Sequence, residues 1–230
     1  MSKRGKLYHA RLETIEAGKV YTASEAVGLL QAMPKPNFDE TVEAAYTLNI
    51  DPRHSGQTVR GMIVLPQGTG KPVTVAVVAT GDPATQAEEA GADEVGGDDL
   101  IDRIKNGWLD FDVLIATPDT MKSLRPLGKT LGPRGLMPNP KTGTLTGDTA
   151  AAVKQAKAGR VEYRNDRNGC VHVPVGKASF SEEALLENVR AVHHAVVEAK
   201  PEGGKGAYIQ GLSLCTTMSP GVKTDFRTLA

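Results

Sequence analysis

Pro72–Thr80, PVTVAVVAT, is the stretch of sequence that decides the fold class of the middle of the chain. Its apolar residues follow one another almost without interruption, as in a strand that is buried on both faces of a parallel sheet. Helical and strand-like stretches alternate after it: ATQAEEAGA, a short strand around Val95, DLIDRIKN, FDVLIATP, PDTMKSLRPLGKTL and DTAAAVKQAKAG, which stops at Gly159. This alternation predicts a small parallel sheet wrapped by helices.

The sequences on either side of this section alternate apolar and polar residues instead. FDETVEAAYTLNID is predicted to be a strand with one apolar face, made of Val42, Ala44, Tyr46, Leu48 and Ile50. TVRGMIVLP is a second strand candidate, and AYIQGLSLCTTM is the last.

Helices and a turn separate these strands. Ser24 is placed to cap the helix SEAVGLLQAM, which ends before Pro34. RVEYRN and GCVHVPVG flank an Asn-Gly turn, which predicts a β-hairpin. SEEALLENVRAVHHAVVEAK is the longest amphipathic helix, with an apolar stripe of Leu185, Val189, Val192, Val196 and Ala199.

The economical architecture is one α+β domain built from both ends of the chain, with an α/β domain inserted. We expect residues 1–67 and 160–230 to form the first and residues 68–159 the second. The chain crossings at Gly68, Gly70 and Gly159 would then make a two-stranded hinge.

The charges of the chain balance but are segregated. Of 230 residues, 27 are basic and 27 acidic, and nine of the acids lie between Ala84 and Asp112 against two bases. Basic residues gather at 3–11, 122–141 and 154–177. An anionic partner is therefore not excluded, but specific geometry has to supply much of the affinity.

The sequence indicates a cytoplasmic protein. No apolar run approaches the ~20 residues of a membrane helix, and the basic N-terminus lacks the apolar stretch of a secretory signal. Cys170 and Cys215 are interpreted as two buried free thiols in a reducing compartment.

Two stretches resemble phosphate-binding loops. Gly135–Thr142, GLMPNPKT, differs from G-x-x-x-x-G-K-[ST] by Pro140, which removes a backbone donor and fixes φ. Gly68–Lys71 is followed by Pro72 and a strand, where the mechanism needs the start of a helix. We expect neither to bind a nucleotide.

No group of residues indicates catalysis, a metal site or a cofactor. The acidic side chains are scattered over a solvated surface, and His193 and His194 point about 100° apart on a helix. His172 either touches a ligand or simply faces solvent. The proline-rich loop LGPRGLMPNPKTGT is either a packing loop or a preformed surface that carries Arg134 and Lys141.

LGPRGLMPNPKTGT, FDETVE, RVEYRND, HVPVGKASF and TTMSPGV, in this order, closely resemble the bacterial large-subunit ribosomal protein L-one family. The resemblance runs from about Lys3 to Val222. It implies an RNA-binding α+β domain formed by both chain ends, and an inserted α/β Rossmann-like three-layer domain on a flexible hinge. It also implies a monomer on the cytoplasmic ribosome that binds the rRNA stalk beside the tRNA exit site. The resemblance further implies that this stalk swings as exit-site tRNA leaves, and that the same protein surface binds the leader of its own operon mRNA to repress translation.

The matching motifs assign an RNA surface by resemblance. It includes Phe38, Thr41, Thr216, Thr217 and Met218, with His172 joining through HVPVGK. Such side chains suit folded RNA, which is recognised largely by shape, 2′-hydroxyl and backbone contacts. The basic residues expected to contact phosphates are Lys3, Lys6, Arg164, Arg167 and Lys177.

Two positions depart from the family's pattern, Ser219 in place of glycine and Asn37 in place of a basic residue. If the backbone at 219 needs φ > 0, serine fits poorly, which predicts slightly weaker or more salt-tolerant RNA binding. The alternative to an RNA-binding protein is a nucleotide- or phosphometabolite-dependent enzyme that uses the carboxyl edge of the parallel sheet.

Overall fold

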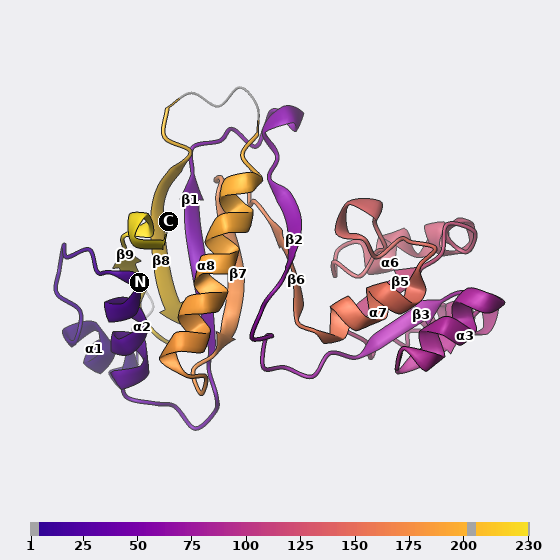
Figure 1. Ribbon diagram of the computed structural model, residues 1–230, viewed down its shortest axis with the longest axis horizontal. Coiled ribbons are helices and arrows are strands. Elements are labelled where there is room, and N and C mark those ends of the chain that lie inside the picture. The colour runs from indigo at the N-terminus through magenta and orange to yellow at the C-terminus, as the bar shows by residue number, and fades with distance from the viewer. Residues whose placement is uncertain (1–4, 202–205, 230) are drawn as a thin grey trace. The chain divides into compact units, whose positions relative to one another are not determined.

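The computed structural model describes residues 5–201 and 206–229 and has a mixed α/β fold (Figure 1). The chain divides into two compact units. One, which we call the end unit, combines Met1–Gly70 with Val161–Ala230, and the other, the middle unit, is Lys71–Arg160. Within the described ranges, no helix is both long and apolar enough to cross a membrane.

The end unit is built on a four-stranded sheet of order β7-β1-β8-β9. β1 (Thr41–Leu48) lies between β7 (Cys170–Lys177) and β8 (Ile209–Thr216) and is antiparallel to both. Val42, Ala44, Tyr46 and Leu48 are buried in the core, as the predicted alternation requires, whereas Ile50 lies beyond the end of β1 and is partly buried. The short edge strand β9 (Val222–Thr224) was not expected from the sequence.

Two helices cover one face of this sheet, α2 (Ala23–Ala32) and α8 (Glu182–Glu198). α8 crosses in front of the strands in Figure 1 and buries Leu185, Val189, Val192 and Val196, as its stripe predicts. α2 is capped by Thr22 and not by Ser24: the Thr22 hydroxyl accepts the Glu25 N–H, and the Glu25 carboxylate accepts the Thr22 N–H at 2.8 Å. Ser24 already lies inside the helix, two residues after the N-cap position.

The predicted hairpin is wrong in its strand pairing. β6 (Arg160–Arg164) pairs with β2 (Arg60–Val64) in a separate two-stranded sheet, whereas β7 pairs with β1. The Asn-Gly turn is present, but a single bridge between Asn165 and Val171 joins its two arms. The arms separate because the backbone and side chain of Asn165 bond to Val59.

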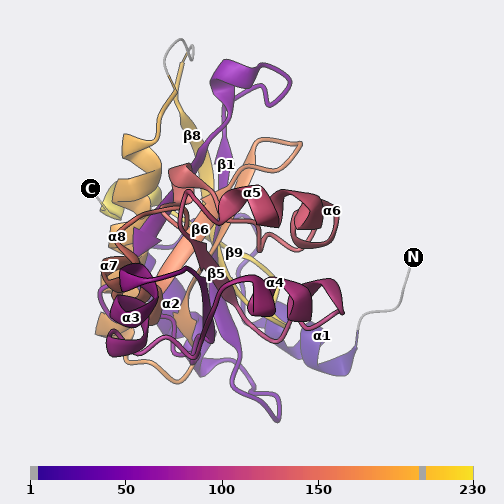
Figure 2. The same cartoon turned by 90° about the vertical axis from the view of Figure 1, so that its right-hand side faces the viewer.

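The middle unit contains a parallel sheet of order β4-β3-β5, made of Glu94–Gly96, Val75–Val78 and Val113–Ala116. All four residues of β3 are buried, as the continuous apolar run predicts. Val75 and Val77 face α3 (Asp82–Glu89) and α7 (Thr149–Lys157). Ala76 and Val78 face α4 (Asp98–Lys105), α5 (Met121–Leu124) and α6 (Gly128–Leu131), which lie together in Figure 2.

The segment predicted as one helix after β5 is divided into α5, a 3-10 turn η2 (Arg125–Leu127) and α6. Pro126 in this turn has no N–H to donate, which favours the break. The proline-rich loop follows and is part of the middle unit's packing, because Leu136 and Met137 contact its core and the Asn139 carbonyl accepts the Thr142 and Thr144 N–H groups. Arg134 is exposed, and the side chain of Lys141 lies outside the described part of the chain.

Candidate nucleic-acid interface

Two segments far apart in the sequence meet at one end of the end-unit sheet. The Thr41 N–H donates a hydrogen bond of 3.2 Å to the Thr217 hydroxyl oxygen, across 176 residues. One residue further along, Val42 of β1 pairs with Thr216 of β8. The loops before β1 and after β8 therefore form one surface.

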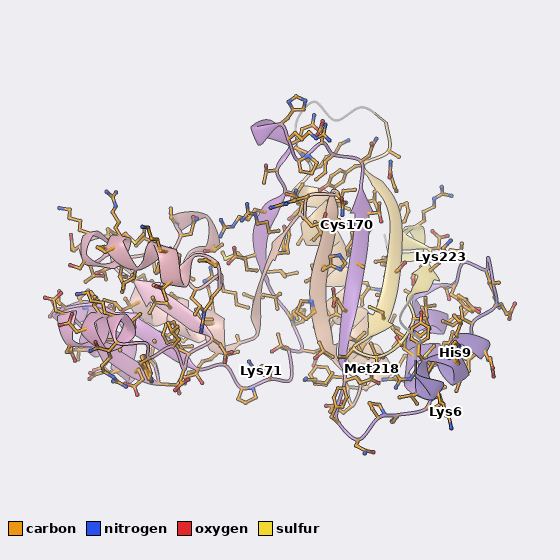
Figure 3. All side chains as sticks on the ribbon, turned by 180° about the vertical axis from the view of Figure 1, so that it is seen from behind. Lys6, His9, Lys71, Cys170, Met218 and Lys223 are labelled. Atoms are coloured by element: carbon orange, nitrogen blue, oxygen red, sulfur yellow. The ribbon has the colours of Figure 1, made fainter. Side chains whose placement is uncertain are left out.

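Exposed apolar side chains stand on this surface. Phe38 is 51% exposed and Met218 is 52% exposed, and Thr217 beside Met218 is also exposed. Figure 3 views the sheet from the side opposite α8 and shows Met218 at the end of the strands. We call Phe38, Thr41, Thr217 and Met218 the end surface. Exposed aromatic, thioether and hydroxyl side chains suit a nucleotide, whose base stacks and whose ribose donates and accepts hydrogen bonds.

Positive charge borders the end surface. The Lys177 ammonium donates to the Thr41 hydroxyl at 3.0 Å, and Lys177 pairs with Thr41 in the sheet. Lys6 is exposed at the start of α1 (Lys6–Glu13), and Figure 3 shows Lys6 and Met218 toward the same end of the sheet. A groove of about 590 Å³ lies between the start of α1 and the loop after β8, lined by Gly5, Leu7, Tyr8 and residues 217–221.

Beneath the end surface is a buried ion pair that the sequence did not reveal. Arg11 of α1 is 1% exposed and its guanidinium lies 2.7 Å from the carboxylate of Glu40, which is 4% exposed. The Thr216 hydroxyl donates to the same carboxylate at 3.1 Å. Thr216 is thus buried and supports the surface from below instead of presenting its hydroxyl to a ligand.

The Ser219 backbone does not have the strain expected from its departure from glycine. Among the described residues, those with positive φ are all glycines. The Ser219 hydroxyl accepts the Thr216 N–H at 2.8 Å and donates to the Pro220 carbonyl at 3.0 Å. Serine therefore closes the turn after β8. Asn37 is exposed.

His172 lies on the open face of the sheet, opposite α8, where its Nδ1 is 2.9 Å from the Glu43 carboxylate.

Cys215 is the sheet neighbour of Glu43, and burial, with the nearby Glu43 charge, raises the pKa of its thiol to about 11. Cys170 and Cys215 are free, as predicted, but both are half-buried where burial was expected. A thiol with so high a pKa stays protonated and unreactive near neutral pH.

Arg164 and Arg167 are not part of this end of the sheet. Arg164 ends β6, and Arg167 precedes Cys170, which pairs with Thr47 at the opposite end of β1 from Thr41. Six residues of strand separate these ends by about 20 Å. The structure therefore divides the expected phosphate contacts into two groups, with Lys6 and Lys177 near the end surface and the two arginines remote from it. Lys3 lies outside the described residues.

The three glycines at the chain crossings have left-handed backbones. Gly68, Gly70 and Gly159 have φ of 67°, 71° and 93°. At Gly70 a Cβ would also lie 2.8 Å from side-chain atoms of Lys177 and Phe180.

In the part of the chain that the structure describes, no cluster of histidine, cysteine or acidic side chains could hold a metal ion.

Comparison with known proteins identifies the family. Residues 30–220 match the Ribosomal protein L1p/L10e family, which covers both segments of the end surface. The chain belongs to this family of ribosomal proteins and is not an enzyme. It is 52% identical, over 227 residues and 99% of each chain, to the large ribosomal subunit protein uL1 of Ligilactobacillus salivarius.

Proposed function

We propose that this protein is a structural constituent of the cytoplasmic large ribosomal subunit and binds rRNA through the end surface. The hydrogen bond between Thr41 and Thr217 carries this proposal, because it joins the two chain ends into one exposed face with Phe38 and Met218. Membership of a ribosomal protein family and the near full-length similarity to a large-subunit protein support the ribosomal assignment.

We further propose that the bound rRNA and this protein form the mobile stalk beside the tRNA exit site. In this arrangement residues 1–67 and 160–230 bind the rRNA, and residues 68–159 move on a hinge at Gly68, Gly70 and Gly159. The left-handed backbone at all three glycines supports the hinge, since a side chain would strain these positions. As a monomer, the protein then assists the release of deacylated exit-site tRNA.

Arg164 and Arg167 fit a second RNA contact in this proposal. They are exposed and about 20 Å from the end surface. A phosphate backbone that reaches them cannot be the same few nucleotides that contact Phe38. The rRNA stalk therefore has to extend along the sheet, or a different RNA, such as the exit-site tRNA, occupies that end.

The same end surface would bind the leader of the protein's own operon mRNA and repress translation. One face that serves two RNAs makes them competitors, so excess rRNA should release the mRNA. A translational reporter fused to the leader should be repressed by the wild-type protein and released from repression by added stalk rRNA.

A binding titration with the folded stalk region of the large-subunit rRNA tests the proposal. Thr217→Val removes the hydroxyl of the end surface and should abolish tight binding. Thr130→Val is the matched control, since Thr130 is an exposed threonine of the middle unit. Equal affinities of the wild-type protein for the stalk rRNA and for an unrelated hairpin would refute the proposed function.

A further inference from the structure

Helix α1 buries one side chain in the end unit. Of its eight residues, Arg11 alone is buried, and Leu12 is 45% exposed. Its N-cap, Gly5, provides no side-chain hydrogen bond. A helix of this length is not stable on its own in water, so it depends on its contacts with the rest of the protein, and Arg11 makes the buried ones.

The Arg11 guanidinium is bonded on two sides. Nη1 donates to Glu40 Oε1 at 2.9 Å and Nη2 donates to Oε2 at 2.7 Å, which makes a bidentate pair. Nε and Nη2 also donate to the Pro34 carbonyl, at 2.9 and 2.6 Å. Bidentate pairing fixes orientation as well as distance, so α1 docks in one position.

Glu40 bonds at the same time to the loop after β8. Its Oε1 accepts the Met218 backbone N–H at 2.8 Å and the Thr216 hydroxyl at 3.1 Å. Burial alone would raise the pKa of Glu40, but these bonds and those from Arg11 outweigh it and hold the pKa below its ordinary value of 4.5. The carboxylate is therefore charged at neutral pH and orients α1 and the backbone of Met218 together.

We propose that Arg11 is a positioning residue for RNA binding, which acts through Glu40 to hold Thr217 and Met218 in the geometry of the end surface. The inference rests on the proposed function. Without Arg11, a buried carboxylate loses its counter-charge, and Glu40 moves toward water or toward other donors. Because coupling between two equilibria is reciprocal, RNA bound at the end surface must in turn stabilise the docked state of α1.

Affinity as a function of salt separates positioning from direct contact. Arg11→Met should weaken binding of the stalk rRNA about 10-fold or more, with the same dependence of log Kd on log salt as the wild type. A lost phosphate contact would instead reduce that slope by about one. Arg11→Lys should recover part of the affinity, since lysine supplies the charge without the bidentate geometry. Arg190→Met, at an exposed arginine of α8, is the matched control and should leave both quantities unchanged.

Amide hydrogen exchange supplies a readout that does not depend on a variant. In the wild-type protein, stalk rRNA should slow exchange in α1 and at Met218. In Arg11→Met, exchange in α1 should be fast with and without RNA, while β1 and β8 keep their protection and show that the end unit is folded. If β1 and β8 lose their protection in Arg11→Met, the role of Arg11 is tested with the affinity of Arg11→Lys and with the effect of rRNA on exchange in the wild-type protein.

The possible outcomes test the role of Arg11 separately from the proposed function. Wild-type affinity in Arg11→Met, a salt slope reduced by one, or α1 exchange that RNA leaves unchanged would each overturn the role of Arg11 and leave the proposed function intact. Failure of the wild-type protein to bind stalk rRNA would overturn the proposed function itself.

Discussion

The side-chain amide of Asn188, fully buried on α8, donates a hydrogen bond of 3.1 Å to the carbonyl of Gly68. The same amide donates to the Val175 carbonyl at 2.8 Å, and its oxygen accepts the Gln67 N–H at 3.0 Å. Asn188 therefore fixes the place where the chain leaves the end unit, next to one of the proposed hinge glycines.

Asn188→Leu should lower the free energy of unfolding of the end unit by about 2–4 kcal/mol, because it leaves buried backbone groups without partners. Chemical denaturation measures the loss. Glu187→Leu, at the neighbouring exposed position whose carboxylate accepts from the Gln67 side chain, should change stability by less than about 1 kcal/mol. A wild-type denaturation midpoint in Asn188→Leu would show that the amide does not anchor the chain.

Phe38→Ala should weaken binding of stalk rRNA with little effect on folding, because the ring is half exposed. The loss of one stacked base corresponds to about 1–3 kcal/mol, or roughly 5- to 150-fold in Kd. Val197→Ala removes a similarly exposed apolar side chain from α8, on the other side of the sheet, and should leave Kd unchanged. Equal Kd values for the two variants would show that Phe38 does not contact the RNA.

Ser219→Gly should lower stability and should not strengthen RNA binding. The variant loses the hydroxyl that accepts the Thr216 N–H, worth about 0.5–1.5 kcal/mol, and it gains backbone freedom in the loop that carries Met218. Thermal unfolding and an rRNA titration of the same sample measure both effects. Adding Asn37→Lys tests the other position that departs from the family's pattern. If the double variant bound rRNA more tightly than the wild type, Ser219 and Asn37 would weaken RNA binding, as the sequence predicts.

Nucleotides should not bind at either phosphate-loop-like stretch. Residues 140–142 form a 3-10 turn, and α7 begins only at Thr149, so no helix N-terminus faces an anion at that loop. Gly70 and Lys71 lead into strand β3. Saturating ATP with magnesium should therefore leave Tm unchanged in the wild type and in Pro140→Gly, and a rise that follows RT ln(1+[L]/Kd) would contradict this.

Stability should fall as pH is lowered through the range in which histidines titrate, in part because of His193. Burial lowers its pKa below the ordinary 6.5, with a smaller contribution from the neighbouring His194. The unfolded chain then binds more protons than the folded chain between the two pKa values, so stability decreases as pH falls from about 7.5, by at most about 1.4 kcal/mol per pH unit. His193→Phe should flatten this dependence, whereas His9→Phe, at an exposed position, should not.

The sequence predicted those elements whose pattern depends on burial alone. The alternation in β1 and the stripe of α8 were identified because each has one face toward a core, and the apolar run of β3 because both of its faces are covered. The hairpin prediction failed because a turn motif that is local in the sequence competed with hydrogen bonds to a residue far along the chain. The Asn-Gly turn formed, but Asn165 bonds to Val59, so its arms entered different sheets.

The sequence predicted the exposed residues of the candidate site but not the buried ion pair beneath them. Phe38, Thr41, Thr217 and Met218 came from motifs, and the hydrogen bond between Thr41 and Thr217 joins the two loops that carry them. Arg11 and Glu40 are 29 residues apart, and no spacing rule predicts that such a pair is buried. The separation of Arg164 and Arg167 from the end surface was equally hidden, because it depends on the direction of β7 relative to β1.

The central place of β1 in the sheet has a consequence for synthesis. Its two neighbours, β7 and β8, are translated 122 or more residues later, whereas residues 71–160 are contiguous and contain a complete sheet of their own. During translation the middle unit can fold while β1 still lacks both partners. The nascent chain therefore completes the sheet that carries the end surface only after β8 has emerged, so a growing polypeptide lacks the joined loops of Thr41 and Thr217 until its synthesis is nearly over.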